Sequence, residues 1–85
     1  MQNYIKPDTD TRTFQQIWNS LTSAEQSSLR GDIREKLGFS RQTVYDWHKN
    51  GASPKSLALR KVVCRIVNKN LGLKTHYLTL FPNAK

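Results

Sequence analysis

The chain has 85 residues, a formal net charge of +8 and a single cysteine. A chain of this length can bury one compact core but not two. It contains neither an apolar stretch long enough to span a bilayer nor an apolar run behind a charged N-terminus, which argues against a membrane protein and a secretory signal. We therefore expect one cytoplasmic domain. Cys64 has no partner for a disulfide or a metal site and is expected to be a packed thiol.

The positive charge is concentrated in the second part of the chain. Up to Asp46, six basic residues balance six acidic ones, whereas from Trp47 onward there are eight basic residues and no acidic residue. A field of one sign attracts polyanions, and nucleic acid is the commonest such partner of a small cytoplasmic domain. The alternatives are a solvated face that aids solubility and a surface for anionic lipid, although the basic stretch is not arranged as a free amphipathic tail.

The first predicted helix follows a polar N-terminal segment. Residues 1–12 lack hydrophobic periodicity and contain Pro7, so we expect a flexible arm here and a folded domain over residues 13–82. The next apolar residues recur with the i, i+3, i+4, i+7 spacing of one buried helix face. This spacing, set by Phe14, Ile17, Trp18 and Leu21, predicts a helix over roughly Thr13 to Ser20.

A capping box marks the start of the second helix. Thr22, with Glu25 three residues later, can satisfy free backbone amides reciprocally, so this helix is predicted to start near Ser23. Gly38 is predicted to end it in a left-handed conformation. Gly31 weakens the middle of the helix by about 1 kcal/mol relative to alanine, which allows its first part to be irregular.

The third helix is predicted to follow a short turn after Gly38. Ser40 can cap a helix that begins at Arg41, and Asn50 and Gly51 mark its end. Together, the second helix, the turn and the third helix form a helix-turn-helix pattern, because glycine tolerates the turn and apolar residues can join the two helices at a steep angle. The apolar residues that would join them are Ile33, Leu37, Phe39, Val44 and Trp47.

Two more helices are predicted in the basic part of the chain. The fourth starts with Ser53 as its cap and Pro54 as its first residue, and it continues to Asn70 or Gly72. Residues 75–81 are expected to form a short fifth helix capped by Thr75, although "YLTLF" also suits an extended segment. The predicted fold class is therefore all-α, a small domain of four to five helices with a central helix-turn-helix.

The helix-turn-helix and the helices that follow it resemble one family. The apolar spacing around Gly38, the serine that precedes the third helix and the later "SPKSLALRKVVCRIVNKNLGL" and "LF" are similar to the Cro and lambda-repressor-like helix-turn-helix domains. This resemblance covers residues 14–81 and implies a five-helix DNA-binding module of the kind found in phages, plasmids and bacterial regulators. The chain departs from the family in the length of its second helix and at Arg34, where the family prefers a small residue.

The resemblance also implies which residues meet DNA. Arg41 and Gln42 occupy positions that read base edges, and their chemistry suits guanine and adenine, respectively. Asp46 can accept from cytosine or orient Gln42 or Lys49. The implied base-reading set is Arg41, Gln42, Tyr45, Asp46 and Lys49. The implied phosphate contacts are Arg30 and Ser40, at the starts of their helical segments, with Thr43, Asn50 and Lys55.

The expected function is sequence-specific binding of double-stranded DNA by a small transcriptional regulator. The resemblance also allows a homodimer that binds a palindromic site. The alternative is a protein-interaction adaptor that keeps the fold and uses the third helix or "YLTLF" for a protein partner. RNA ranks third because a short helix cannot read the narrow major groove of A-form RNA. His48 and His76 have no ligand partner at suitable spacing, and the serines and acids form no triad. We expect no enzyme activity, metal, cofactor or small-molecule ligand.

Overall fold

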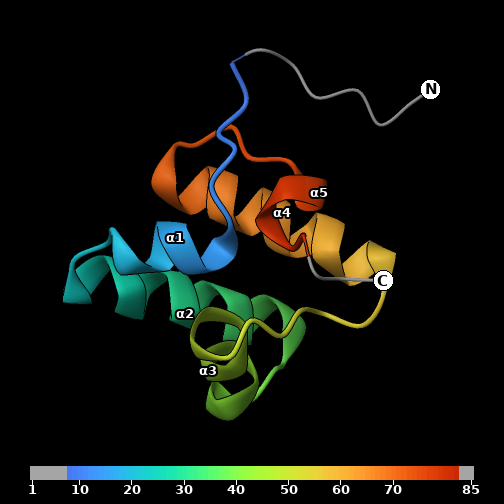
Figure 1. Ribbon diagram of the computed structural model, residues 1–85. Coiled ribbons are helices and arrows are strands. Elements are labelled where there is room, and N and C mark those ends of the chain that lie inside the picture. The colour runs from blue at the N-terminus through green and yellow to red at the C-terminus, as the bar shows by residue number, and fades with distance from the viewer. Residues whose placement is uncertain (1–7, 83–85) are drawn as a thin grey trace.

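The computed structural model describes residues 8–82, and every regular element in this range is a helix (Figure 1). The predicted all-α class with a central helix-turn-helix is therefore confirmed, and residues 75–81 contain a helix and not a strand. None of the described helices is both long and apolar enough to cross a membrane. In chain order the helices are α1 (Phe14–Asn19), α2 (Ser23–Leu37), α3 (Arg41–Lys49), α4 (Leu57–Leu71) and α5 (Tyr77–Leu80).

The two ends of α2 follow the local sequence signals. The Thr22 hydroxyl accepts a hydrogen bond from the Glu25 amide, and the Glu25 carboxylate accepts one from the Thr22 amide. At the other end, Gly38 has φ of 70°, and its N–H donates to the Arg34 carbonyl. The helix continues without a break through Gly31, because Leu29 and Ile33 on either side are fully buried and hold it against the core.

The predicted start of the fourth helix is wrong. α4 begins at Leu57, where the Ser56 hydroxyl accepts from the Leu59 amide at 3.1 Å, and not at Ser53 and Pro54. Pro54 is buried, and its carbonyl accepts from Arg60 Nε at 3.0 Å, so this residue is fixed in the segment before the helix.

The predicted cap of the fifth helix is also wrong. α5 begins after His76, whose Nδ1 accepts from the Leu78 amide at 3.1 Å. Thr75 is buried instead: its hydroxyl donates to Asn68 Oδ1 at 2.6 Å and lies 3.3 Å from the sulfur of Cys64. Cys64 is a buried free thiol, as its apolar surroundings in the sequence predicted.

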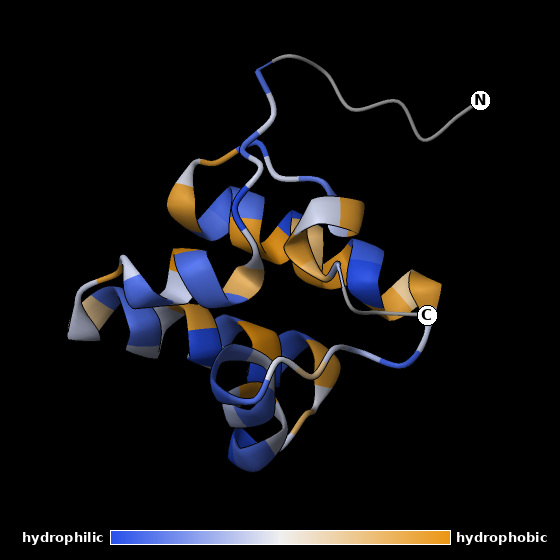
Figure 2. Cartoon of the chain, in the orientation of Figure 1, coloured by the Kyte–Doolittle hydropathy of each residue, from blue (hydrophilic) through white to orange (hydrophobic). Residues whose placement is uncertain are grey.

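Aromatic rings form the centre of the core. The rings of Phe14, Trp47 and Phe81 contact one another with centroid separations of 5.5 to 6.1 Å, and they join α1, α3 and the end of α5. Aliphatic side chains of α2 and α4 complete this core, and Figure 2 shows apolar residues on the sides of the helices that face the interior. The buried aliphatic residues include Leu29, Ile33, Val63, Ile66 and Val67.

The segment before α1 lies against the loop between α4 and α5. The Asp10 amide donates to the Lys74 carbonyl at 2.8 Å, and Asp10 forms an isolated bridge with Thr75. Arg12 pairs with Asp10 at 2.7 Å, and Lys74 pairs with Asp8 at 3.1 Å. The first seven residues of the predicted arm lie outside the described residues.

Gly31 within α2 and Gly38 at its C-terminal end provide a matched test of the turn. Nothing lies within 4 Å of a Cβ added at Gly31 or Gly38, so the two sites differ in backbone conformation and not in space. Gly38→Ala should lower the free energy of unfolding by about 1 kcal/mol, because an L-residue is strained at positive φ. Gly31→Ala should raise it by about 1 kcal/mol, because alanine is the better helix former. Urea unfolding followed by circular dichroism measures both changes, and equal effects would contradict the assignment of the turn.

Candidate nucleic-acid interface

The candidate interface is centred on α3, which follows the turn after Gly38 and is capped at its N-terminus by Ser40. Ser40 Oγ accepts from the Thr43 amide at 3.2 Å and lies 3.0 Å from the Thr43 hydroxyl. The first amides of a helix have no partner within the helix, and the helix dipole adds partial positive charge there. Ser40, Arg41 and Gln42 are exposed, so this end of α3 can meet an anion.

Two buried side chains decide which face of α3 points outward. Val44 is 0% exposed and Trp47 is 3% exposed, so both hold the helix to the core. At about 100° per residue, the opposite face then points to solvent. That face carries the predicted base-reading residues Gln42, Tyr45 and Lys49, and Arg41 flanks it at the N-terminal end of the helix. All four are exposed.

Asp46 links the outward face to the end of the helix. One of its carboxylate oxygens, Oδ1, accepts from Gln42 Nε2 at 3.0 Å and from Asn50 Nδ2 at 2.9 Å. An amide nitrogen has two donors, so Gln42 keeps one N–H and its Oε1 for another partner. This geometry corresponds to the second of the two predicted roles of Asp46, the orientation of Gln42.

His48 joins α3 to α1 through a ring stack that the sequence did not predict. Its imidazole lies 4.1 Å from the Trp18 ring with an angle of 7° between planes, and Tyr45 contacts it edge-on at 5.3 Å. Burial, followed by the positive charges of Arg30 and Lys49, lowers the pKa of His48 below its ordinary value. No local sequence pattern predicts this stack, because it depends on how α1 packs against α3.

Arg30 does not lie at the start of a helical segment, which corrects its predicted placement. It lies in the middle of α2, because the helix begins at the Thr22 capping box and not just before Arg30. Arg30 is half-buried, and its charge acts on His48 of α3. Arg34, one turn later, is exposed, so the long side chain is accommodated by pointing to solvent.

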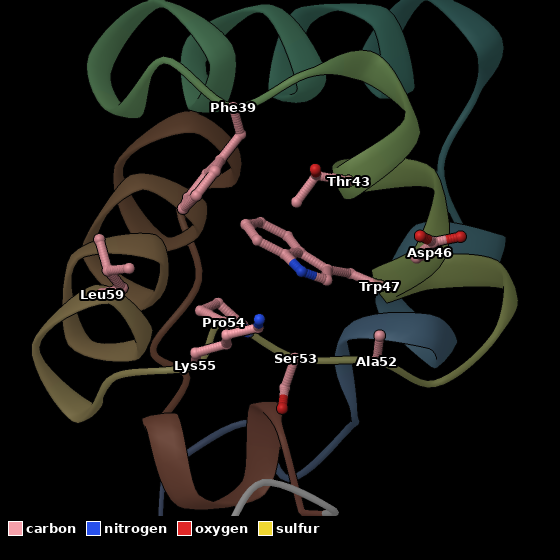
Figure 3. Close-up of a pocket in the computed structure, with 9 residues that line it drawn as sticks. All are labelled: Phe39, Thr43, Asp46, Trp47, Ala52, Ser53, Pro54, Lys55 and Leu59. Carbon is pink, nitrogen blue, oxygen red and sulfur yellow. The ribbon is translucent and has the colours of Figure 1, made fainter.

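A hollow of about 400 Å³ lies beside α3 (Figure 3). The Trp47 indole lies between Phe39 and Pro54, and the rim includes two predicted phosphate contacts, Thr43 and Lys55. Thr43 is half-buried and Lys55 is exposed. The chain between α3 and α4 therefore folds back beside α3. It brings Lys55 next to that helix, although Lys55 follows the last residue of α3, Lys49, in the sequence.

The cations after Trp47 do not form one surface. Lys49 and Lys55 lie at or beside α3, Arg60 donates to the carbonyls of Pro54 and Lys55, and Lys74 pairs with Asp8. The remaining described cations of this part of the chain lie on the exposed side of α4, and they are Lys61, Arg65 and Lys69.

Comparison of the chain with protein-family models, with curated proteins and with solved structures found no match.

The His48 stack predicts a pH-dependent stability. Because its pKa is lowered in the folded state, the unfolded chain binds more protons, and stability is lost as the pH falls through the ordinary histidine value of about 6.5. The free energy of unfolding should therefore decrease between pH 7.5 and 5 by more in the parent than in His48→Gln. Urea unfolding at several pH values measures the difference. A His48 imidazole that titrates above 6.5 by NMR would contradict this prediction, since it would indicate that the Trp18 ring stabilises the imidazolium.

Proposed function

We propose that the domain binds double-stranded DNA through α3 and acts as a small transcriptional regulator. The observation that carries the proposal is the outward face of α3, where Arg41 and a pre-oriented Gln42 lie at the exposed end of a helix anchored by Val44 and Trp47. A helix of this size fits the major groove of B-DNA, where each base pair presents a distinct pattern of donors and acceptors.

The side chains at the start of α3 suit base recognition. Arg41 can donate two hydrogen bonds to O6 and N7 of guanine, and Gln42 can donate to N7 and accept from the amino group of adenine. The bond to Asp46 leaves Gln42 the donor and the acceptor that adenine requires. Because Asp46 already restricts the Gln42 side chain, Gln42 loses less conformational freedom when it binds DNA. The Asp46 carboxylate itself accepts hydrogen bonds from Gln42 and Asn50.

The residues around this face suit contacts to phosphate. Ser40 and Thr43 place hydroxyl groups beside the free amides of the α3 N-terminus, and Lys55 adds a charge from the following segment. Arg30, whose charge acts on His48 of α3, and Asn50, at the end of that helix, are the further candidates for phosphate contacts. The adaptor alternative has less support, because the exposed large apolar side chains lie on three different helices: Tyr45, Leu57 and Leu78.

Substitutions should separate base reading from phosphate binding. Arg41→Ala or Gln42→Ala should weaken binding to a duplex enriched from a random pool by about 1–3 kcal/mol and should affect a scrambled duplex less. Lys55→Ala should weaken binding to both duplexes similarly, because phosphates do not differ between sequences. Fluorescence anisotropy titrations of both duplexes measure these changes.

The salt dependence and three control variants complete the experiment. Four to six phosphate contacts predict a slope of about −4 to −5 when the logarithm of the affinity is plotted against the logarithm of the salt concentration, and Lys55→Ala should reduce the magnitude of this slope by about one. Trp47→Ala should unfold the domain at a cost of about 3–5 kcal/mol, whereas Lys74→Ala should leave binding nearly unchanged. Asp46→Ala should weaken specific binding but strengthen binding to the scrambled duplex, because it frees Gln42 and removes a negative charge. Folded Arg41 and Gln42 variants that bind both duplexes like the parent would refute α3 as the reader.

A further inference from the structure

The outer side of α4 carries a row of positive charge that the α3 interface does not use. Lys61, Arg65 and Lys69 are all exposed and repeat every four residues. At about 100° per residue they fall within roughly 80° of one another and lie nearly opposite the buried Val63 and Val67. We call these three residues the α4 stripe.

The α4 stripe and the α3 interface lie on different sides of the molecule. α2 packs against both α3 and α4, and Figure 1 shows α4 above α2 and α3 below it. Asp32 and Lys36 line the groove between α2 and α4, whereas the charge of Arg30 acts on α3. A duplex seated on α3 therefore leaves the α4 stripe open to a second partner.

Within residues 8–82, cations outnumber acids in the groove along the α4 stripe. α4 contains no acidic residue, and the one carboxylate that lines the groove beside it belongs to Asp32. Asp32 accepts from Asn70 Nδ2 at 2.7 Å, but this neutral amide leaves its negative charge in place, so Asp32 offsets one of the cations that line the groove. Lys36 adds a cation on the other side of the groove. Lys61 lies 5.3 Å from the centre of the Tyr77 ring, which positions its charge at the end of the stripe.

The partner that fits this surface is recognised by charge and not by apolar contact. Protein interfaces usually need a buried aromatic or aliphatic anchor. The groove beside the stripe has a volume of about 210 Å³, and four of its six lining residues are charged, so only Val62 and Ile66 are available for an apolar contact. The stripe spans about 12 Å along the helix, a distance over which a DNA duplex carries about seven phosphates.

We propose that the α4 stripe binds the phosphate backbone of a second nucleic-acid duplex, so that one copy of the domain holds two duplexes. The inference rests on the proposed function only for the duplex bound at α3. Because the stripe contacts phosphates alone, the second duplex is bound without sequence preference and is released by salt. Such a domain would hold a distant segment of DNA beside its specific site.

A retention experiment tests the proposal. The selected duplex is immobilised on beads, the protein is added, and retention of a fluorescent duplex of scrambled sequence is measured. The parent should retain the second duplex at low salt, and the combined variant Lys61→Gln, Arg65→Gln, Lys69→Gln should retain about tenfold less. Its affinity for the selected duplex alone should change less than about threefold at 0.15 M salt, where charges beyond about 8 Å are screened. Lys74→Gln removes one charge outside both surfaces and should behave like the parent.

Several results would overturn the proposal. Retention by the combined variant equal to that of the parent would show that bridging arises elsewhere, for example from a dimer that holds one duplex on each copy. A parent that binds the selected duplex but retains no second duplex would refute the α4 stripe and leave the α3 proposal intact, whereas no binding to either would refute both. Stripe-dependent binding of poly-L-glutamate without retention of a second duplex would favour an acidic polypeptide partner instead.

Discussion

The burial of the Trp47 indole is the interaction on which the rest of the structure depends. Its ring contacts Phe14 of α1, Phe39 of the turn and Phe81 after α5, so one side chain joins three separate parts of the chain. Burial of a large aromatic side chain contributes more than any surface ion pair in such a small domain. The orientation of α3 follows from it, because the helix cannot rotate about its axis without removing the indole from the core.

This constraint turns a short helix into a rigid presenting element. α3 has only 9 residues, too few to be stable alone in water. Val44 and Trp47 hold the backbone of α3 in place. The cap at Ser40 and the hydrogen bonds of Asp46 with Gln42 and Asn50 then fix the orientation of exposed groups on this backbone. Side chains held in this way lose less conformational entropy when they bind a partner. The Pro54 segment packs against the same indole and brings Lys55 beside the helix.

Local signals in the sequence predicted much of the fold, and the errors arise where distant contacts decide. The Thr22 capping box and Gly38 were identified correctly because each acts within one turn of a helix. Ser53 and Ser56 are both suitable caps by local chemistry, and the choice of Ser56 depends on the burial of Pro54 and its bond with Arg60. The same reasoning applies at α5, where the buried bonds of Thr75 with Asn68 and Cys64 prevent it from acting as the cap.

The candidate site was predictable to a similar extent. Helical periodicity was sufficient to place Gln42, Tyr45 and Lys49 on the exposed face of α3, with Arg41 beside them. The stack of His48 on Trp18 was not predictable, because it joins helices whose packing angle is not encoded in either one. Net charge predicted an attraction for polyanions, but only the packing of α4 against α2 separates the α4 stripe from the cations beside α3.

The central claim is that the outward face of α3 meets DNA, and amide chemical-shift mapping tests it most directly. A uniformly ¹⁵N-labelled sample would be titrated with a duplex enriched from a random pool, with the duplex kept below the protein concentration. The account predicts that the largest shifts or line broadening occur at the amides from Ser40 to Lys49 and at Lys55. Large changes confined to α5 and the start of α4, with the α3 amides unaffected, would contradict it.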